Sequence, residues 1–290
     1  MNPKKSLGQH WLHDETSLSA MVEAGEVGPT DTVVEVGPGL GTLTKKLVEA
    51  AKEVIAIEVD PVLAVNLQIN INRRQPELAR GEPVESDSGS YEASTWIPDQ
   101  VRNDRTLNLT VAHENVLEFD FSKIKPGYKV VANIPYYLTS NLIRTLLEAS
   151  NPPSVMALLV QKEVAERIVA KPGQMSILSV SVQFYAEAKL LEVVPAELFT
   201  PPPKVDSQII QIKRHNEPLF TDVDVDQFFK IVKAGFSEKR KKLRSSLSGA
   251  LNISKDEVDL WLNKSGIAPD ARAQELTLND WYKLTKIGII

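Results

Sequence analysis

Three glycines, each separated from the next by one residue, break the chain directly after a β-branched apolar run. The stretch reads Val33-Val34-Glu35-Val36-Gly37-Pro38-Gly39-Leu40-Gly41, and a helix is predicted to follow over residues 42–51. Glycine permits positive φ and lets a ligand approach the backbone closely. The spacing differs from that of a dinucleotide fingerprint, and the Gly-Lys-Ser or Gly-Lys-Thr of a phosphate loop is absent. This segment therefore predicts an α/β fold with a cradle for a nucleotide-like ligand that lacks phosphates.

A second apolar run, residues 54–60, ends in the acids Glu58 and Asp60. A carboxylate at the end of this strand can accept hydrogen bonds from both hydroxyls of a ribose. Ligands of open α/β sheets bind where the strands end, so Glu58 is predicted to lie beside the glycine loop.

The tetrapeptide Asn133-Ile134-Pro135-Tyr136 marks another strand end. It follows the apolar run 129–132 and precedes a helix predicted over residues 138–149. Alone, Asn-x-Pro is also ordinary turn chemistry. Its position at the same sheet edge as the glycine loop and Glu58 makes Asn133 the predicted centre of the chemistry.

Together these motifs resemble the class I S-adenosylmethionine-dependent methyltransferases. The wider set of segments 8–12, 35–41, 133–137 and 199–207 resembles the ribosomal RNA adenine dimethyltransferase family. The resemblance implies a Rossmann-like sheet with helices on both faces and S-adenosylmethionine as cofactor. It further implies N6,N6-dimethylation of two adjacent adenosines near the 3′ end of small-subunit ribosomal RNA, within a pre-ribosomal small subunit.

The resemblance also implies which residues bind the cofactor: Gln9, His10, Leu12, Gly37, Gly39, Glu58, Asn115 and Asn133. The family usually has Asn where this chain has His10, and generally has Asp where it has Asn115. An Asn oxygen can still accept a hydrogen bond from the adenine amine of the cofactor. A shift of one residue in the alignment would place Glu114 there instead.

Four residues are expected to act on the target base: Asn133, Pro135, Tyr136 and Phe199. The Asn133 oxygen and the carbonyl of Ile134 or Pro135 would accept the amine hydrogens of the target adenine. Tyr136 would stack on this base, with Phe199 on its other face. The alternative for Phe199 is that it packs under the proline-rich loop that follows it.

The formal charge of −5 hides a cluster of cations at residues 239–244. We expect RNA phosphates to be bound by this cluster and by two lysines near the N-terminus; the residues are Lys4, Lys5, Lys239, Arg240, Lys241, Lys242 and Arg244. A solvated helix face is the alternative for the cluster, since the run is predicted to lie on a helix over residues 239–250.

Composition argues against a metal site and against a membrane or signal segment. There is no cysteine, and the four histidines lack ligand spacing, so no metal is expected. No apolar stretch approaches a membrane span or a signal core, which favours a cytoplasmic protein, and a monomer is expected.

Two domains are predicted: residues 1–214 bind the cofactor and catalyse, and residues 215–290 form a small all-α RNA-binding domain. Residues 73–106 are rich in Pro, Ser and charged residues and are expected to be a flexible insertion. By its pattern, the stretch 175–185 fits a helix or a strand; the resemblance favours a helix. The other expected helices span 16–24, 161–170, 225–236, 255–264 and 278–287, and strands are expected at 107–112, 154–160, 189–194 and 205–213.

Two rival functions share these motifs. One is methylation of an adenosine in large-subunit RNA, as in macrolide-resistance enzymes; the runs 200–207 and 236–247 look more like the small-subunit group. The other is a non-catalytic assembly or transcription factor of the same fold. The presence of Gly37, Glu58, Asn133 and Tyr136 argues against it.

Overall fold

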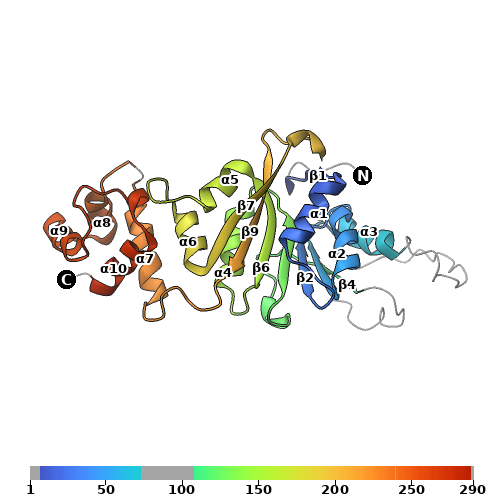
Figure 1. The fold of residues 1–290 in the computed structure, drawn as a ribbon, viewed down its shortest axis with the longest axis horizontal. Coiled ribbons are helices and arrows are strands. Elements are labelled where there is room, and N and C mark those ends of the chain that lie inside the picture. The colour runs from blue at the N-terminus through green and yellow to red at the C-terminus, as the bar shows by residue number, and fades with distance from the viewer. Residues whose placement is uncertain (1–6, 73–107, 239, 289–290) are drawn as a thin grey trace, which may run out of the picture.

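A sheet of seven strands forms the centre of the computed structural model, which describes residues 7–72, 108–238 and 240–288 (Figure 1). The strand order is β4-β3-β2-β5-β6-β9-β7. The strands are β2 (Thr32–Val36), β3 (Glu53–Glu58), β4 (Leu109–His113), β5 (Lys129–Asn133), β6 (Val155–Gln161), β7 (Ala186–Val194) and β9 (Ser207–Arg214). The strands from β4 to β6 are parallel, and β9 runs antiparallel to both of its neighbours. The carboxyl ends of β2, β3, β4 and β5 therefore meet at one edge.

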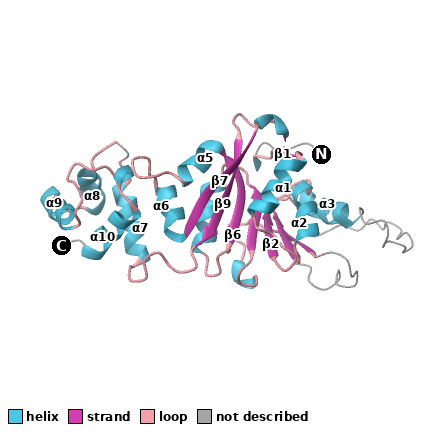
Figure 2. Ribbon diagram, in the orientation of Figure 1, coloured by secondary structure: helices cyan, strands magenta, loops and turns pink. Residues whose placement is uncertain are grey.

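Helices cover both faces of the sheet, as the resemblance implies (Figure 2). Val33 and Val131 pack in a core with α1 and α2, whereas Val34 and Val130 pack in a core with α4, α5 and α6. Alternate residues point to opposite faces, and both faces are buried, so the strands read as continuous apolar runs. The helices are α1 (Glu15–Ala24), α2 (Thr42–Ala50), α3 (Pro61–Asn72), α4 (Thr139–Glu148), α5 (Lys162–Ile168) and α6 (Ile177–Tyr185).

The ambiguous stretch 175–185 is a helix. Ser176 and Ser179 form a capping box at the start of α6, which satisfies N–H groups that a helix start leaves without partners. At its other end α6 passes directly into β7 at Ala186. This strand starts three residues earlier than the sequence predicts.

Four further helices build a second core: α7 (Val225–Gly235), α8 (Leu243–Leu251), α9 (Lys255–Lys264) and α10 (Leu278–Ile287). They gather at the end of the molecule opposite α1, α2 and α3 (Figure 1). Phe228, Trp261 and Trp281 are buried in this core, and Phe184 of α6 joins them. The last strand of the sheet along the chain, β9, ends at Arg214. Because α6 contributes side chains to both cores, the small helical unit packs directly on the larger one.

The start predicted for the helix over residues 239–250 is wrong. Helix α8 begins at Leu243, because Lys242 has an extended backbone, with φ −64° and ψ 148°. Before it, the Lys241 N–H donates to the Glu238 carbonyl in a turn. Arg240, Lys241 and Lys242 therefore lie on a loop and not on successive turns of a helix.

Two short strands that no sequence pattern indicates pair outside the main sheet. β1 (Trp11–Leu12) runs antiparallel to β8 (Phe199–Thr200), with Leu12 opposite Phe199. This pairing joins the N-terminal segment to the proline-rich loop. None of the helices described here is long and apolar enough to cross a membrane. The predicted insertion, residues 73–106, lies outside the described residues.

Candidate functional site

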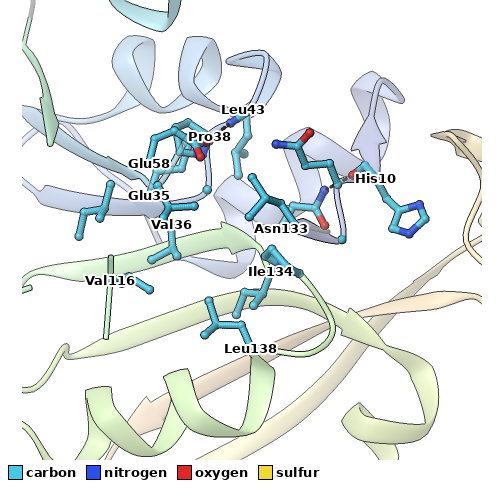
Figure 3. Close-up of a pocket in the computed structure, with 18 of the residues that line it drawn as sticks. His10, Glu35, Val36, Pro38, Leu43, Glu58, Val116, Asn133, Ile134 and Leu138 are labelled. Atoms are coloured by element: carbon cyan, nitrogen blue, oxygen red, sulfur yellow. Dashed lines mark hydrogen bonds between the residues drawn. The ribbon is translucent and has the colours of Figure 1, made fainter. Parts of the chain in front are cut away.

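A cavity of about 290 Å³ opens at the carboxyl ends of the parallel strands (Figure 3). Its walls come from the loops after β2, β3, β4 and β5 and from the N-terminal segment, residues 7–12. All of the predicted cofactor residues lie along this wall: Gln9, His10, Leu12, Gly37, Gly39, Glu58, Asn115 and Asn133. The sequence motifs thus converge on one hollow, although they lie far apart along the chain.

The glycine loop forms one wall because its backbone takes the left-handed conformation. Gly37 has φ +65° and Gly39 has φ +58°, values that side chains disfavour. A Cβ atom on Gly39 would lie 3.2 Å from the indole nitrogen of Trp11. The loop can therefore approach both a ligand and the N-terminal segment closely.

Glu58 ends β3 and is only 4% exposed. Its two carboxylate oxygens accept hydrogen bonds from the N–H of Asp60 at 2.9 Å and the N–H of Gly39 at 3.2 Å. Burial raises the pKa of Glu58, and these two N–H groups counteract the rise. The carboxylate lines the cavity, so its remaining acceptor capacity faces a ligand that carries hydroxyl groups.

Asn115 and Glu114 follow β4, and both line the cavity. The Asn115 oxygen accepts a hydrogen bond from the Leu117 N–H at 3.2 Å, while its amide nitrogen donates to Glu118 at 2.9 Å. The oxygen can accept one further bond, as the predicted contact to an adenine amine requires. Glu114 is also exposed at this rim, so both residues of the one-residue alternative reach the cavity.

Asn133 stands at the end of β5 with its carboxamide fixed. Its nitrogen donates to the backbone carbonyl of His10 at 3.0 Å. The side-chain oxygen is then the group left to accept hydrogen bonds from a ligand. Next in the motif, the Pro135 carbonyl already accepts from the Leu138 N–H at 2.9 Å. Of the two predicted carbonyl acceptors, this favours that of Ile134.

Tyr136 is held by two contacts from distant segments. Its hydroxyl hydrogen-bonds with the Ser207 hydroxyl at 2.8 Å, and burial raises the pKa of the phenol. The His10 ring stacks on the tyrosine ring, with centroids 5.8 Å apart and 21° between planes. The His10 Nδ1 donates to the Pro201 carbonyl at 2.7 Å. In Figure 3 the His10 ring lies on the opposite side of Asn133 from Glu35 and Glu58.

Two predicted residues are buried among apolar side chains. Phe199 is 3% exposed and packs in a core with Leu12, Leu18 and Ile209. It does not line the cavity. Its position matches the alternative of packing beneath the proline-rich loop and differs from the stacking role, because a covered ring offers no face to a base. Leu12 reaches the cavity from the same core.

One residue of the site was not selected from the sequence. Glu35, in β2, is 1% exposed and lines the cavity. Burial raises its pKa to about 8; the Thr44 hydroxyl counteracts the rise and Glu58 adds to it. The available signal was an acid inside an otherwise apolar strand. The described lining holds Glu35, Glu58 and Glu114 but no lysine or arginine.

Two of the described cations in the basic cluster, residues 239–244, form ion pairs with nearby acids. Arg244 pairs with Asp259 at 2.7 Å and approaches Asp256 at 3.6 Å, and Lys241 pairs with Glu238 at 2.9 Å. Arg240 and Lys242 are exposed on the loop before α8. They are the better candidates for phosphate contacts. Lys4, Lys5 and Lys239 lie outside the described residues.

Comparison with known proteins agrees with this geometry. A family model for ribosomal RNA adenine dimethylase matches residues 1–80 and 84–289. A Dehalococcoides mccartyi protein named ribosomal RNA small subunit methyltransferase A is 38% identical over 98% of this chain and 88% of its own. A Clostridium botulinum protein of the same name is 35% identical over 97% of this chain and 92% of its own.

Two solved structures share the whole architecture. A dimethyladenosine transferase from Plasmodium falciparum aligns with a TM-score of 0.70 at 25% identity, covering 95% of this chain and 96% of its own. The 23S rRNA methyltransferase ErmE aligns with a TM-score of 0.68 at 25% identity, covering 95% and 98%. From the matched family model and the two curated relatives, the chain belongs to the ribosomal RNA adenine dimethylase family.

Proposed function

We propose that the protein transfers methyl groups from S-adenosylmethionine to N6 of two adjacent adenosines near the 3′ end of small-subunit ribosomal RNA. It acts in the cytoplasm, as a monomer, on a pre-ribosomal small subunit. The observation that carries the proposal is the carboxamide of Asn133, fixed through its nitrogen at the rim of the cavity. The relatives named ribosomal RNA small subunit methyltransferase A support the choice of RNA.

The residues of the cavity fit the cofactor. A wall with three glutamates and no described lysine or arginine suits a cationic ligand without phosphates. Glu58 would accept the ribose hydroxyls, and Asn115 or Glu114 the adenine amine. The loop backbone at Gly37 and Gly39, with the segment from Gln9 to Leu12, would enclose the remainder. When bound, S-adenosylmethionine supplies a methyl group on a positively charged sulfur.

The target amine is a weak nucleophile because its lone pair is delocalised into the adenine ring. The Asn133 oxygen and the Ile134 carbonyl would accept its two hydrogens and favour a pyramidal nitrogen with a directed lone pair. This is positioning with electrostatic stabilisation, and no general base is needed before transfer. For the second transfer only one hydrogen remains, so the pocket must let the amine turn.

Tyr136 would hold the base itself. Stacking of a base on an aromatic ring contributes about 1–3 kcal/mol. The hydroxyl contact with Ser207 fixes the plane of this ring. Because His10 stacks on this ring, the base would use the remaining face or displace the imidazole.

The test is Asn133→Ala, assayed with undermethylated small subunits and labelled S-adenosylmethionine, followed by mapping of the modified bases. We expect loss of methyl transfer with cofactor binding largely kept, because the lost oxygen serves the acceptor amine. Asn141→Ala, at an exposed position of α4, is the matched control and should retain activity. Undiminished turnover by Asn133→Ala would contradict this mechanism.

The same assay separates the rival functions. Methylation of adenosines in free large-subunit RNA, with none in small subunits, would favour the rival enzyme. Absence of measurable S-adenosylmethionine binding would favour the non-catalytic factor.

A further inference from the structure

At the cavity wall, one oxygen of a buried carboxyl group has no hydrogen-bond partner. The Oε2 atom of Glu35 is shielded from water and has no hydrogen-bond partner within the described part of the chain. The residue is 1% exposed, and Figure 3 places it beside Val36 and Glu58 at the cavity wall. A buried charge without a partner is strongly unfavourable, so such a group stays neutral until a positive charge arrives.

Among the residues that the structure describes, no fixed cation near Glu35 supplies that charge. From β3 the group faces the acid Glu58, which itself neighbours Asp60. On the α2 side it meets the Thr44 hydroxyl, while Lys46 of this helix pairs with Glu15 of α1 at 2.7 Å.

The remaining wall does not supply it either. The neighbouring strand β5 contributes the neutral Asn133. The other titratable groups of the described cavity wall are Glu114, His10 and the two tyrosines of the loop after β5, and the wall holds no lysine or arginine. Glu35 therefore has no lysine or arginine counter-charge in the described wall, and a positive ligand would supply one.

We infer that Glu35 couples cofactor capture to proton release: it holds a proton in the ligand-free protein and loses it when the positively charged methyl donor enters the cavity. The O–H bond of the Glu35 carboxyl breaks, the electron pair stays on the carboxylate, and the proton passes to solvent. This inference rests on the proposed function, since that function names a cationic cofactor. At neutral pH the ligand-free carboxyl is mostly neutral, because burial raises its pKa to about 8.

The first test is calorimetry of S-adenosylmethionine binding at pH 7.0 in two buffers of different ionisation enthalpy. The buffer dependence of the binding enthalpy gives the number of protons released. We expect nearly one proton for the wild-type protein and close to one fewer for Glu35→Gln. Glu49→Gln removes a carboxyl from the exposed side of α2, outside the cavity lining, and should keep the wild-type proton release. A wild-type enthalpy that is the same in both buffers overturns the inference.

The second test is the pH dependence of affinity. If the ionised carboxyl binds the donor, the Kd of the wild-type protein should fall about tenfold for each pH unit between pH 6 and 7. Glu35→Gln should lose this slope. Equal slopes in the two proteins would assign the proton to another group and overturn the inference.

Glu35 is buried, so its variant could fail to fold, and a measurement on the wild-type protein covers that case. With ¹³C-labelled glutamate, one carboxyl signal should be protonated at pH 7 in the free protein and ionise on addition of S-adenosylmethionine. No such signal would contradict the inference. Binding of S-adenosylmethionine without proton release would contradict only this inference, whereas absence of binding would contradict the proposed function as well.

Discussion

At the scale of single residues, the site depends on contacts between segments that are far apart in the chain. The His10 carbonyl holds the Asn133 amide, and the His10 ring lies against Tyr136. The hydroxyl of Tyr136 reaches Ser207, the first residue of β9. These contacts fix the orientation of Asn133 and Tyr136, which in the proposed mechanism would lower the entropic cost of reaching the reactive geometry.

The Tyr136–Ser207 hydrogen bond should matter for the rate of methyl transfer and not for cofactor binding. A neutral hydrogen bond is worth about 0.5–1.5 kcal/mol, so Ser207→Ala should lower single-turnover rates roughly two- to tenfold. Tyr136→Phe removes the same bond from the other side. The double variant should therefore be no slower than the slower single variant, because only one interaction is lost.

A matched control is Ser154→Ala. This serine donates to backbone carbonyls at the opposite end of the sheet. Its removal should leave the single-turnover rate unchanged. If the rate reductions of the two single variants multiply in the Tyr136→Phe, Ser207→Ala double variant, the two residues do not act through one shared hydrogen bond.

At the scale of elements, the glycine loop must fit between the sheet and helix α3. Gly41 precedes α2 with φ +80°, and a Cβ there would lie 2.6 Å from Cδ1 of Leu67. Leu67 is 1% exposed in the packing of α3, so it has little room to yield. The loop is thus constrained both by its backbone conformation and by the close approach of α3.

Gly41→Ala should destabilise the protein more than Gly127→Ala. Gly127 has φ +87°, but a Cβ added there would meet no atom within 4 Å, so its substitution costs only backbone strain. That strain is about 1–2 kcal/mol. Gly41→Ala adds a clash with Leu67 and a shift of the loop. The free energy of unfolding from urea titration, together with the Kd for S-adenosylmethionine, measures both effects.

We expect weakened cofactor binding in Gly41→Ala alone. Equal losses of stability in the two variants, with unchanged cofactor affinity, would show that α3 does not confine the loop.

At the scale of the whole molecule, the proposed function requires an acidic protein to bind a polyanion. The net charge is −5, so binding has to come from local positive surface. The loop before α8 carries the exposed Arg240 and Lys242, on a helical unit whose core includes Phe184 of α6. Because that unit packs directly on the larger one, which holds the cavity, RNA bound to the loop would be held in a set relation to the cavity.

Arg240→Glu with Lys242→Glu should raise the KM for small subunits and leave the Kd for S-adenosylmethionine unchanged. Each lost phosphate contact should also reduce the slope of log K against log salt by about one. The control pair Lys52→Glu with Lys125→Glu changes the charge equally at exposed positions of the catalytic unit. Equal effects of the two pairs on KM would assign RNA binding to overall charge and not to this loop.

The sequence alone determined the backbone plan of the site. The apolar run before Gly37, the acid Glu58 after the next strand and the tetrapeptide from Asn133 to Tyr136 are local patterns. Their strands, and the convergence of their ends at one edge, follow from periodicity and glycine chemistry. The resemblance settled the stretch 175–185 as a helix, where periodicity alone left two choices.

Only the tertiary structure decided which side chains are covered and which partners they meet. The burial of Phe199, the contact of His10 with Tyr136 and the missing partner of Glu35 all depend on segments distant in sequence. The start of α8 at Leu243 likewise goes against a run of residues that favours a helix. Local patterns set where the backbone turns, but burial and charge compensation depend on what the rest of the chain brings alongside.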